Sequence, residues 1–248
     1  MVYQPHSQTT PMAECPELNK YSDFEVVEDQ SQEPALRYFV HHSSQSAGTI
    51  IFFHGNAGSA CDRLKRIRDF SADIQRRYNI VFPEYPGYAG DKTEKSEATL
   101  TANALAVFDA FQNVGPITVI GRSLGSTIAN YVASKRPVKR LALISPPTSI
   151  VAVAGHLIPG LKPLLKTILV NHTYDAYLWA KTVDIAPLII QGDEDKVVPI
   201  DMAEELAGQF PLGYKLVNIK GVGHNDILQH KEYKSSLNSM FRQPSAQP

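Results

Sequence analysis

The stretch "ITVIGRSLGSTIANYVASK" (117–135) places a serine where it could act as a nucleophile. Ser123 lies in a G-x-S-x-G pattern between a β-type apolar run and an amphipathic run. A sharp strand-to-helix turn of this kind exposes a serine hydroxyl and puts the unpaired N–H groups of the first helical turn beside it. Gly121 and Gly125 suit such a turn, because side chains there would collide with the neighbouring strand and helix. The pattern therefore indicates a nucleophile, and the alternative is that Ser123 only caps the helix.

A serine hydroxyl alone is a weak nucleophile, so this hypothesis requires a base and an acid that orients the base. His224, in "GVGHND", lies in a loop after the last apolar run. Asp193 and Asp195, in "GDEDKVVP", follow the preceding apolar run. Taken singly, His224 could be an ordinary surface histidine, and either aspartate could be a helix cap or a solvated charge. These residue types alone leave the choice of aspartate open.

A glycine-rich loop, "FFHGNAG" (52–58), follows another apolar run. Such a loop can direct main-chain N–H groups at a developing oxyanion. It could also cradle a phosphate, but the G-x-x-x-x-G-K-[ST] pattern is absent and Gly55 and Gly58 do not complete G-x-G-x-x-G. We therefore expect an oxyanion hole here rather than a nucleotide site.

These residues need a sheet that brings the ends of several strands together. Short runs rich in Val, Ile and Leu predict strands at 25–29, 35–42, 49–54, 79–85, 116–121, 138–145, 186–192 and 214–219. Helical spacing predicts helices at 59–78, 94–114, 125–135, 201–210 and 226–241. This alternation indicates an α/β fold, a doubly wound and mostly parallel sheet with helices on both faces. Ligands of such sheets bind beyond the carboxyl ends of the strands, where the candidate residues fall.

The alternation stops at about 146–181, which predicts a small helical cap. Its apolar residues are Ile150, Val151, Val153, Leu157, Ile158, Leu161, Leu164, Leu165, Ile168 and Leu169, with Tyr174, Tyr177 and Trp179 behind them. Most of these side chains must pack the cap onto the domain. Some could line an apolar pocket for an acyl chain.

The charges of the chain nearly cancel, with 24 Lys and Arg against 25 Asp and Glu and a net charge of −1. This balance leaves no basic field to collect nucleic acid or an anionic bilayer, so the sequence leaves membrane contact open without indicating it. With 43% hydrophobic and 20% charged residues, a sizeable core can form. We therefore expect a small-molecule or acyl-group substrate rather than a polyanionic partner.

Cys15 and Cys61 are too few for a disulfide framework and lack C-x-x-C spacing. We expect free thiols in a reducing compartment. The opening "MVYQPHSQTTPMAEC" lacks the basic and apolar regions of a secretory signal. The apolar stretch 149–170 is interrupted by lysines, a histidine and prolines, so we do not expect it to span a membrane. Together these features predict a cytoplasmic protein.

Five motifs, in order, carry a family resemblance: "FFHGNAG", "EYPGYAG", "IGRSLGS", "GDEDKVVP" and "GHND". This set resembles the α/β-hydrolase superfamily and, within it, the Bem46-like group that includes ABHD13- and ABHD17-type serine hydrolases. The likeness covers about 23–241. It implies an N-terminal extension at 1–22 and a single α/β-hydrolase domain at 23–248, with the cap inserted at about 146–181. One departure is Ala89 of "GYAG", where relatives often carry glycine.

The resemblance also implies roles for individual residues. Ser123 would be the nucleophile, His224 the base and Asp195 the acid of G-x-x-D-x-x-V-P, with Asp193 a non-catalytic neighbour. The oxyanion donors would be the main-chain N–H of Leu124 and that of Asn56 or Ala57. The residues implied to support these loops are His54, Gly55, Gly121 and Gly125.

The implied function is hydrolysis of carboxylic esters or thioesters through an acyl-enzyme, with no metal and no cofactor. Two alternatives remain open at this point. One is an amidase or peptidase of the same fold. The other is a non-catalytic ligand-binding protein, although all three triad positions are occupied.

Overall fold

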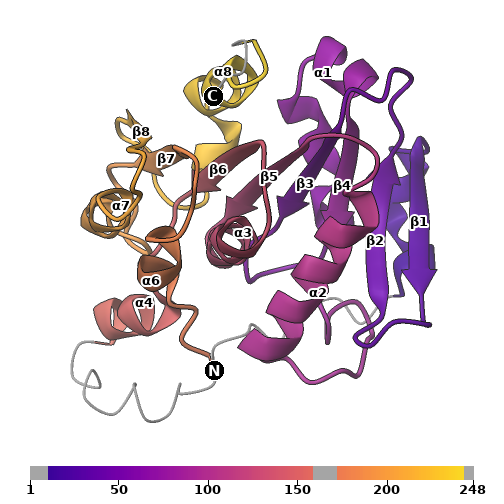
Figure 1. The fold of residues 1–248 in the computed structure, drawn as a ribbon, viewed down its shortest axis with the longest axis horizontal. Helices are drawn as coiled ribbons and strands as arrows, with labels where there is room; N and C mark the ends of the chain where they lie inside the picture. The colour runs from indigo at the N-terminus through magenta and orange to yellow at the C-terminus, as the bar shows by residue number, and fades with distance from the viewer. Residues whose placement is uncertain (1–10, 159–171, 243–248) are drawn as a thin grey trace.

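The computed structural model describes residues 11–158 and 172–242, and an eight-stranded sheet organises them (Figure 1). The strand order is β1-β2-β4-β3-β5-β6-β7-β8. Strands β1 and β2 pair in antiparallel fashion, as do β2 and β4, and the remaining neighbours are parallel. The strands are β1 (Phe24–Asp29), β2 (Leu36–His41), β3 (Thr49–Phe53), β4 (Asn79–Pro83), β5 (Ile117–Arg122), β6 (Arg140–Ile144), β7 (Leu188–Gly192) and β8 (Lys215–Ile219). The predicted mostly parallel α/β sheet is confirmed, with each strand inside or within one residue of a predicted run.

Helices follow most of the strands. The α-helices are α1 (Ala72–Arg77), α2 (Glu97–Phe111), α3 (Leu124–Lys135), α4 (Ile150–Leu157), α6 (Ala176–Ala180), α7 (Ile200–Ala207) and α8 (Lys231–Ser239). The 3-10 helices are η1 (Met12–Glu14), η2 (Pro16–Asn19), η3 (Cys61–Asp69) and η5 (Ile227–Gln229).

The single helix predicted at 59–78 is wrong in detail, because two helices occupy this stretch. Phe70 takes up an extended conformation that ends η3. The hydroxyl of Ser71 then accepts the N–H of Ile74 and starts α1 as an N-cap. An N-cap serine inside an amphipathic pattern marks such a break, and the apolar spacing alone does not reveal it.

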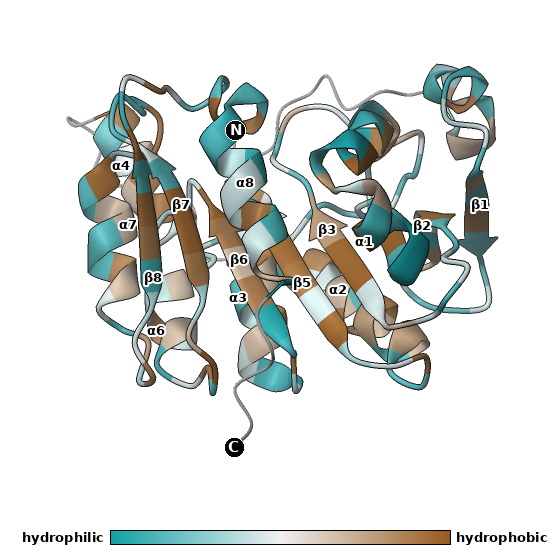
Figure 2. Cartoon of the chain, turned by 90° about the horizontal axis from the view of Figure 1, so that it is seen from above, coloured by the Kyte–Doolittle hydropathy of each residue, from teal (hydrophilic) through white to brown (hydrophobic). Residues whose placement is uncertain are grey.

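The sheet separates two hydrophobic layers. Alternate residues of β3 face opposite sides: Ile51 and Phe53 pack with the layer that contains α2, α3, α6 and α7, whereas Ile50 and Phe52 pack with the layer that contains η3, α1 and α8. Figure 1 shows α1 and α8 on one side of the sheet and α2 and α3 on the other. The central strands are almost continuously apolar (Figure 2), as expected for a sheet covered on both faces.

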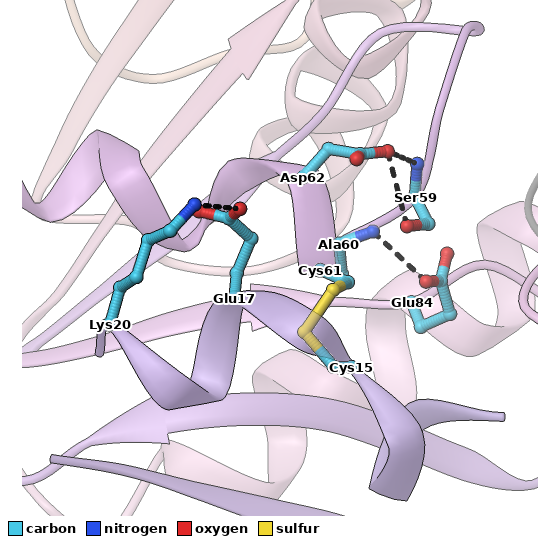
Figure 3. Close-up of a disulfide and its surroundings, with 8 residues drawn as sticks. All are labelled: Cys15, Glu17, Lys20, Ser59, Ala60, Cys61, Asp62 and Glu84. Carbon is cyan, nitrogen blue, oxygen red and sulfur yellow. Dashed lines mark hydrogen bonds and ion pairs between the residues drawn. A yellow bond between two sulfur atoms is a disulfide. The ribbon is translucent and has the colours of Figure 1, made fainter. Parts of the chain in front are cut away.

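Cys15 and Cys61 form a disulfide, so the prediction of free thiols is wrong (Figure 3). The bond joins the N-terminal 3-10 helices to the first residue of η3, 46 positions along the chain. Both cysteines are buried in the layer that contains η3. Two cysteines with no motif spacing still pair when the fold brings them together. The expected reducing compartment depended on free thiols and no longer follows.

The predicted cap is described only at its two ends. Helices α4 and α6 lie within 146–181, and the N–H of Ile150 donates to the carbonyl of Thr173 at 3.0 Å, which brings the two ends of the cap together. The predicted apolar residues Leu161, Leu164, Leu165, Ile168 and Leu169 lie outside the described residues. In the parts of the chain that the structure describes, no helix has both the length and the apolar character needed to cross a membrane.

Candidate active site

Ser123 occupies a strained turn between β5 and α3. Its backbone has φ 53° and ψ −120°, in a region that L-residues rarely adopt. A Cβ at Gly121 would lie 2.1 Å from the carbonyl oxygen of Gly125, and a Cβ at Gly125 would lie 2.2 Å from that of Phe53. Both positions therefore require glycine. The side chain of Ser123 makes no capping hydrogen bond to α3 in the described structure, so helix capping does not account for this serine.

The structure brings Ser123, His224 and Asp195 into one hydrogen-bonded series. His224 Nδ1 lies 2.7 Å from Asp195 Oδ2, and His224 Nε2 lies 3.2 Å from Ser123 Oγ. An ionised carboxylate only accepts, so Nδ1–H donates to Asp195 and Nε2 of the neutral ring is left to accept the serine proton. This is the orientation that a general base for a serine nucleophile requires.

Asp193 contacts Gly221 and Lys220 rather than His224. The structure therefore distinguishes the two aspartates, which the residue types alone could not. Its Oδ1 accepts the N–H of Gly221 at 2.7 Å, and its Oδ2 lies 3.2 Å from Lys220 Nζ. Asp193 thus stabilises the turn that leads into the His224 loop (220–226), without reaching the imidazole.

Asp195 is held as a carboxylate by several donors. Burial acts to raise its pKa, but the hydrogen bond from His224 and the N–H groups of Val198 and Val197, at 2.8 and 2.9 Å, outweigh burial and hold that pKa below its usual value. Gln191 is a contributor that the sequence reasoning missed: it donates to the carbonyl of Val198 at 2.8 Å and lies 3.4 Å from Asp195 Oδ2. The acid loop (193–199) is therefore held by its own main-chain N–H groups, by the His224 ring and by the Gln191 side chain.

The predicted oxyanion loop (54–58) lies beside the serine turn. Strand β3 pairs with β5 so that Phe53 is opposite Gly121, and a Cβ on Gly125 would lie 2.4 Å from the carbonyl oxygen of His54. The predicted donors come from this loop and from the first residue of α3, Leu124. The Tyr88 hydroxyl lies 3.0 Å from Asn56 Oδ1 and supports the loop from the "GYAG" segment.

His54 supports the oxyanion loop from within the core, together with a residue that the sequence reasoning missed. His54 Nδ1 lies 2.7 Å from the carbonyl oxygen of Gly55, and the Tyr85 hydroxyl donates to the carbonyl of His54 at 2.6 Å. His54 Nε2 lies 3.4 Å from the fully buried carboxylate of Glu84. The sequence feature that could have indicated a role for Glu84 is its position directly after the strand "NIVFP".

The "GYAG" segment keeps its turn despite carrying alanine. Ala89 has φ 46°, in the left-handed region that favours glycine, and its side chain is buried. The buried guanidinium of Arg37 donates to the carbonyls of Tyr88 and Ala89, both at 2.8 Å. These two charge-assisted bonds hold a conformation that alanine disfavours.

A residue in the described part of the cap reaches the acid loop. His156 of α4 lies with Nε2 3.2 Å from the carbonyl oxygen of Lys196. Leu157 and Ile158, beyond it, are 55% and 50% exposed. Within residues 11–158 and 172–242, no three His, Cys, Asp or Glu side chains gather as a metal site.

Comparison with known proteins gives the same fold. A family model described as "alpha/beta hydrolase fold" matches residues 48–169. The crystal structure of an esterase from Pyrococcus furiosus superimposes with a TM-score of 0.70 at 16% identity, covering 91% of this chain and 92% of that one.

Relatives by sequence come from bacteria, fungi and vertebrates. An uncharacterized protein of Mycobacterium tuberculosis is 32% identical over 76% of this chain and 67% of its own length. The lysophosphatidylserine lipase ABHD12 of Xenopus tropicalis is 26% identical over 78% of this chain and 52% of its own. Protein bem46 of Schizosaccharomyces pombe is 25% identical over 63% of this chain and 54% of its own. The chain thus spans about half the length of the last two. It belongs to the α/β-hydrolase superfamily and, within it, to the Bem46-like family.

Proposed function

We propose that this protein is a serine hydrolase that cleaves carboxylic esters or thioesters. The observation that supports this most directly is the hydrogen-bonded series from Ser123 Oγ through the His224 ring to Asp195, with 3.2 and 2.7 Å between the bonded atoms. A serine, a histidine and a carboxylate in this order form the arrangement that activates a hydroxyl nucleophile.

In the proposed reaction, Ser123 Oγ attacks the carbonyl carbon while His224 Nε2 takes the hydroxyl proton. The tetrahedral intermediate collapses, and His224 returns the proton to the departing alcohol or thiol. Water then attacks the acyl-enzyme by the same route and releases the acid and free Ser123. Asp195 keeps the Nδ1 proton in place and stabilises the imidazolium that forms.

The oxyanion is assigned to the N–H of Leu124 and to an N–H of the oxyanion loop, from Asn56 or Ala57. Leu124 is the first residue of α3, so its N–H is one of those without a partner inside the helix. Loss of one such donor lowers kcat by roughly 10²–10³-fold in studied enzymes.

The substrate that fits best is an ester or thioester with an apolar acyl chain. One relative, of which this chain covers about half, is named a lysophosphatidylserine lipase, and Leu157 and Ile158 at the C-terminal end of α4 in the cap have exposed apolar side chains. An apolar cap over the nucleophile would favour each buried methylene by about 0.8 kcal/mol. A series of p-nitrophenyl esters and matched thioesters should then show kcat/KM rising with chain length, whereas a flat profile would rule out an acyl pocket.

The nucleophile is tested by labelling with a fluorophosphonate probe. Wild-type protein should be labelled at Ser123, as mapped by peptide mass spectrometry, and Ser123→Ala should not be. Ser126→Ala is the matched control, because Ser126 also lies at the start of α3 and its hydroxyl donates to the carbonyl of Ser123. Labelling that persists in Ser123→Ala would overturn the assignment. Labelling of Ser123 without turnover of any ester, thioester or amide would favour a non-catalytic protein.

A further inference from the structure

Arg122 connects the nucleophile to the loop that carries the base. It is the last residue of β5, directly before Ser123. Its Nη2 donates to the carbonyl oxygen of His224 at 2.7 Å and lies 3.2 Å from Asn225 Oδ1. The Arg122 side chain thus contacts a loop that lies about a hundred residues later in the sequence.

The same guanidinium packs against the oxyanion loop. A Cβ built on Gly55 would lie 2.9 Å from Arg122 Nη1 and 3.5 Å from the carbonyl oxygen of Arg122. A side chain at position 55 would displace the guanidinium, so the present position of the guanidinium requires glycine there. Arg122 therefore touches both loops that must keep their positions relative to Ser123.

The charge of Arg122 is present at neutral pH. Burial is the main cause that lowers its pKa to about 10, the neighbouring Arg63 adds to this, and Asp195 opposes it. A group with this pKa remains cationic at pH 7. Its attraction to the Asp195 carboxylate adds to the hydrogen bond that it donates to the backbone of His224.

Among the described residues, not every N–H donor of the Arg122 guanidinium has a hydrogen-bond acceptor. Arg122 Nε is buried and has no hydrogen-bond partner among the residues that the structure describes. A buried unpaired N–H of this kind costs free energy. An apolar side chain of similar length would avoid that cost, so stability alone does not explain an arginine here.

We propose that Arg122 is a positioning residue for catalysis. Through its hydrogen bond to the His224 carbonyl, it fixes the distance between the His224 loop and Ser123, so that Nε2 of the ring stays within hydrogen-bonding reach of the Ser123 hydroxyl. This proposal rests on the proposed function, because it assumes that Ser123 and His224 react.

The test compares Arg122→Met, which removes the charge and the hydrogen bonds, with Arg122→Lys, which keeps the charge on a different geometry. Arg136→Met is the matched control: Arg136 makes a two-point contact with Asp109, at 2.7 and 2.8 Å, away from the triad. Steady-state kinetics with a p-nitrophenyl ester give kcat and KM, and thermal unfolding gives the stability of each variant. Active sites are counted with the fluorophosphonate probe.

Arg122→Met should lower kcat per active site about 10- to 100-fold with little change in KM, as expected for loss of hydrogen bonds from a charged group. Arg122→Lys should recover part of kcat, because it keeps a cationic donor at this position. Arg136→Met should match wild type in kcat and KM.

Three results would overturn the proposal. These are an unchanged kcat in Arg122→Met, a kcat of Arg122→Lys no higher than that of Arg122→Met, and an equal fall of kcat in Arg136→Met. If Arg122→Met does not fold, Asn225→Ala and Arg122→Lys carry the test, and wild-type kinetics in both would overturn it. Failure of wild-type protein to label at Ser123 would instead refute the proposed function, whatever the Arg122 variants do.

Discussion

The carboxylate of Glu84 accepts a hydrogen bond from the backbone N–H of Ala60 at 2.9 Å, so a residue at the end of β4 holds the exit of the oxyanion loop (Figure 3). Glu84 also accepts the N–H of Tyr85 at 3.1 Å and lies 3.4 Å from His54 Nε2. One buried carboxylate thereby contacts residues on both sides of the segment from which the second oxyanion donor is proposed to come.

Glu84→Ala should lower both stability and turnover. It leaves the N–H of Ala60 buried without this partner, which should cost roughly 1–3 kcal/mol of unfolding free energy. A less well held oxyanion loop should lower kcat about 10-fold or more, with KM less affected. Urea unfolding and ester kinetics measure the two effects. Glu84→Gln keeps an acceptor oxygen, so its unfolding free energy and its kcat should lie between those of wild type and Glu84→Ala.

The matched control is Glu25→Gln, at an exposed carboxylate that pairs with His42 at 2.7 Å far from the loop. It should leave kcat unchanged. If Glu84→Ala lost stability but kept wild-type kcat per folded molecule, Glu84 would have no part in the oxyanion loop's function.

Asp195→Asn and Asp193→Asn should differ sharply, although the two carboxylates are two positions apart. Only Asp195 accepts the Nδ1 proton of His224, so its replacement by an amide favours the wrong ring tautomer and should lower kcat about 10³–10⁴-fold. Asp193→Asn affects the bond to Gly221 in the turn and should keep kcat within a few-fold of wild type. Equal losses in the two variants would contradict the assignment of the acid.

The contribution of Asp195 to stability should depend on pH in a defined direction. Burial opposes its charge, but the hydrogen bonds from His224 and the loop amides prevail, so its pKa is lower in the folded protein than the ordinary value of 3.8. A depressed pKa contributes stability at pH values above the unfolded-state pKa, and this contribution is lost as the pH falls through the folded-state pKa.

The measurement is the difference in unfolding free energy between wild type and Asp195→Asn, taken from urea unfolding at several pH values. The difference should be nearly constant from pH 7 to about 5 and should narrow below about pH 4, because the amide does not titrate. A difference that grows on acidification would mean that the folded protein disfavours the carboxylate.

Reduction of the Cys15–Cys61 bond should destabilise the protein. The bond closes a loop of 46 residues, and cross-links of this span typically stabilise folded proteins by about 2–4 kcal/mol. A dithiol such as dithiothreitol would reduce the bond to two thiols and become a cyclic disulfide itself. Thermal unfolding with and without the dithiol should show a lower Tm in its presence.

The double variant Cys15→Ser/Cys61→Ser is the control, and its Tm should be low and insensitive to the dithiol. Mass spectrometry of the alkylated wild-type protein should find both thiols blocked from reaction until the dithiol is added. Free thiols in untreated protein purified under air would contradict the pairing.

The positions of the strands and of the serine turn could be predicted from the sequence, because both depend on local patterns in the chain. Continuous apolar runs make buried strands, and each predicted run from 25–29 to 214–219 contains a strand or matches one to within a residue. The glycines on both sides of Ser123 likewise marked the turn, since their lack of a Cβ is a local requirement that the close contacts of Gly121 and Gly125 now explain. The family resemblance, rather than spacing, favoured Asp195 over Asp193.

Which distant side chains meet could not be predicted from local patterns. The pairing of Cys15 with Cys61, the carboxylate of Glu84 on the N–H of Ala60, and the guanidinium of Arg122 on the carbonyl of His224 join residues 46, 24 and 102 positions apart. Nothing in the local pattern around either partner specifies the other. Such contacts depend on how strands are ordered in the sheet and on how loops fold back over its edge, and these are properties of the whole packed domain.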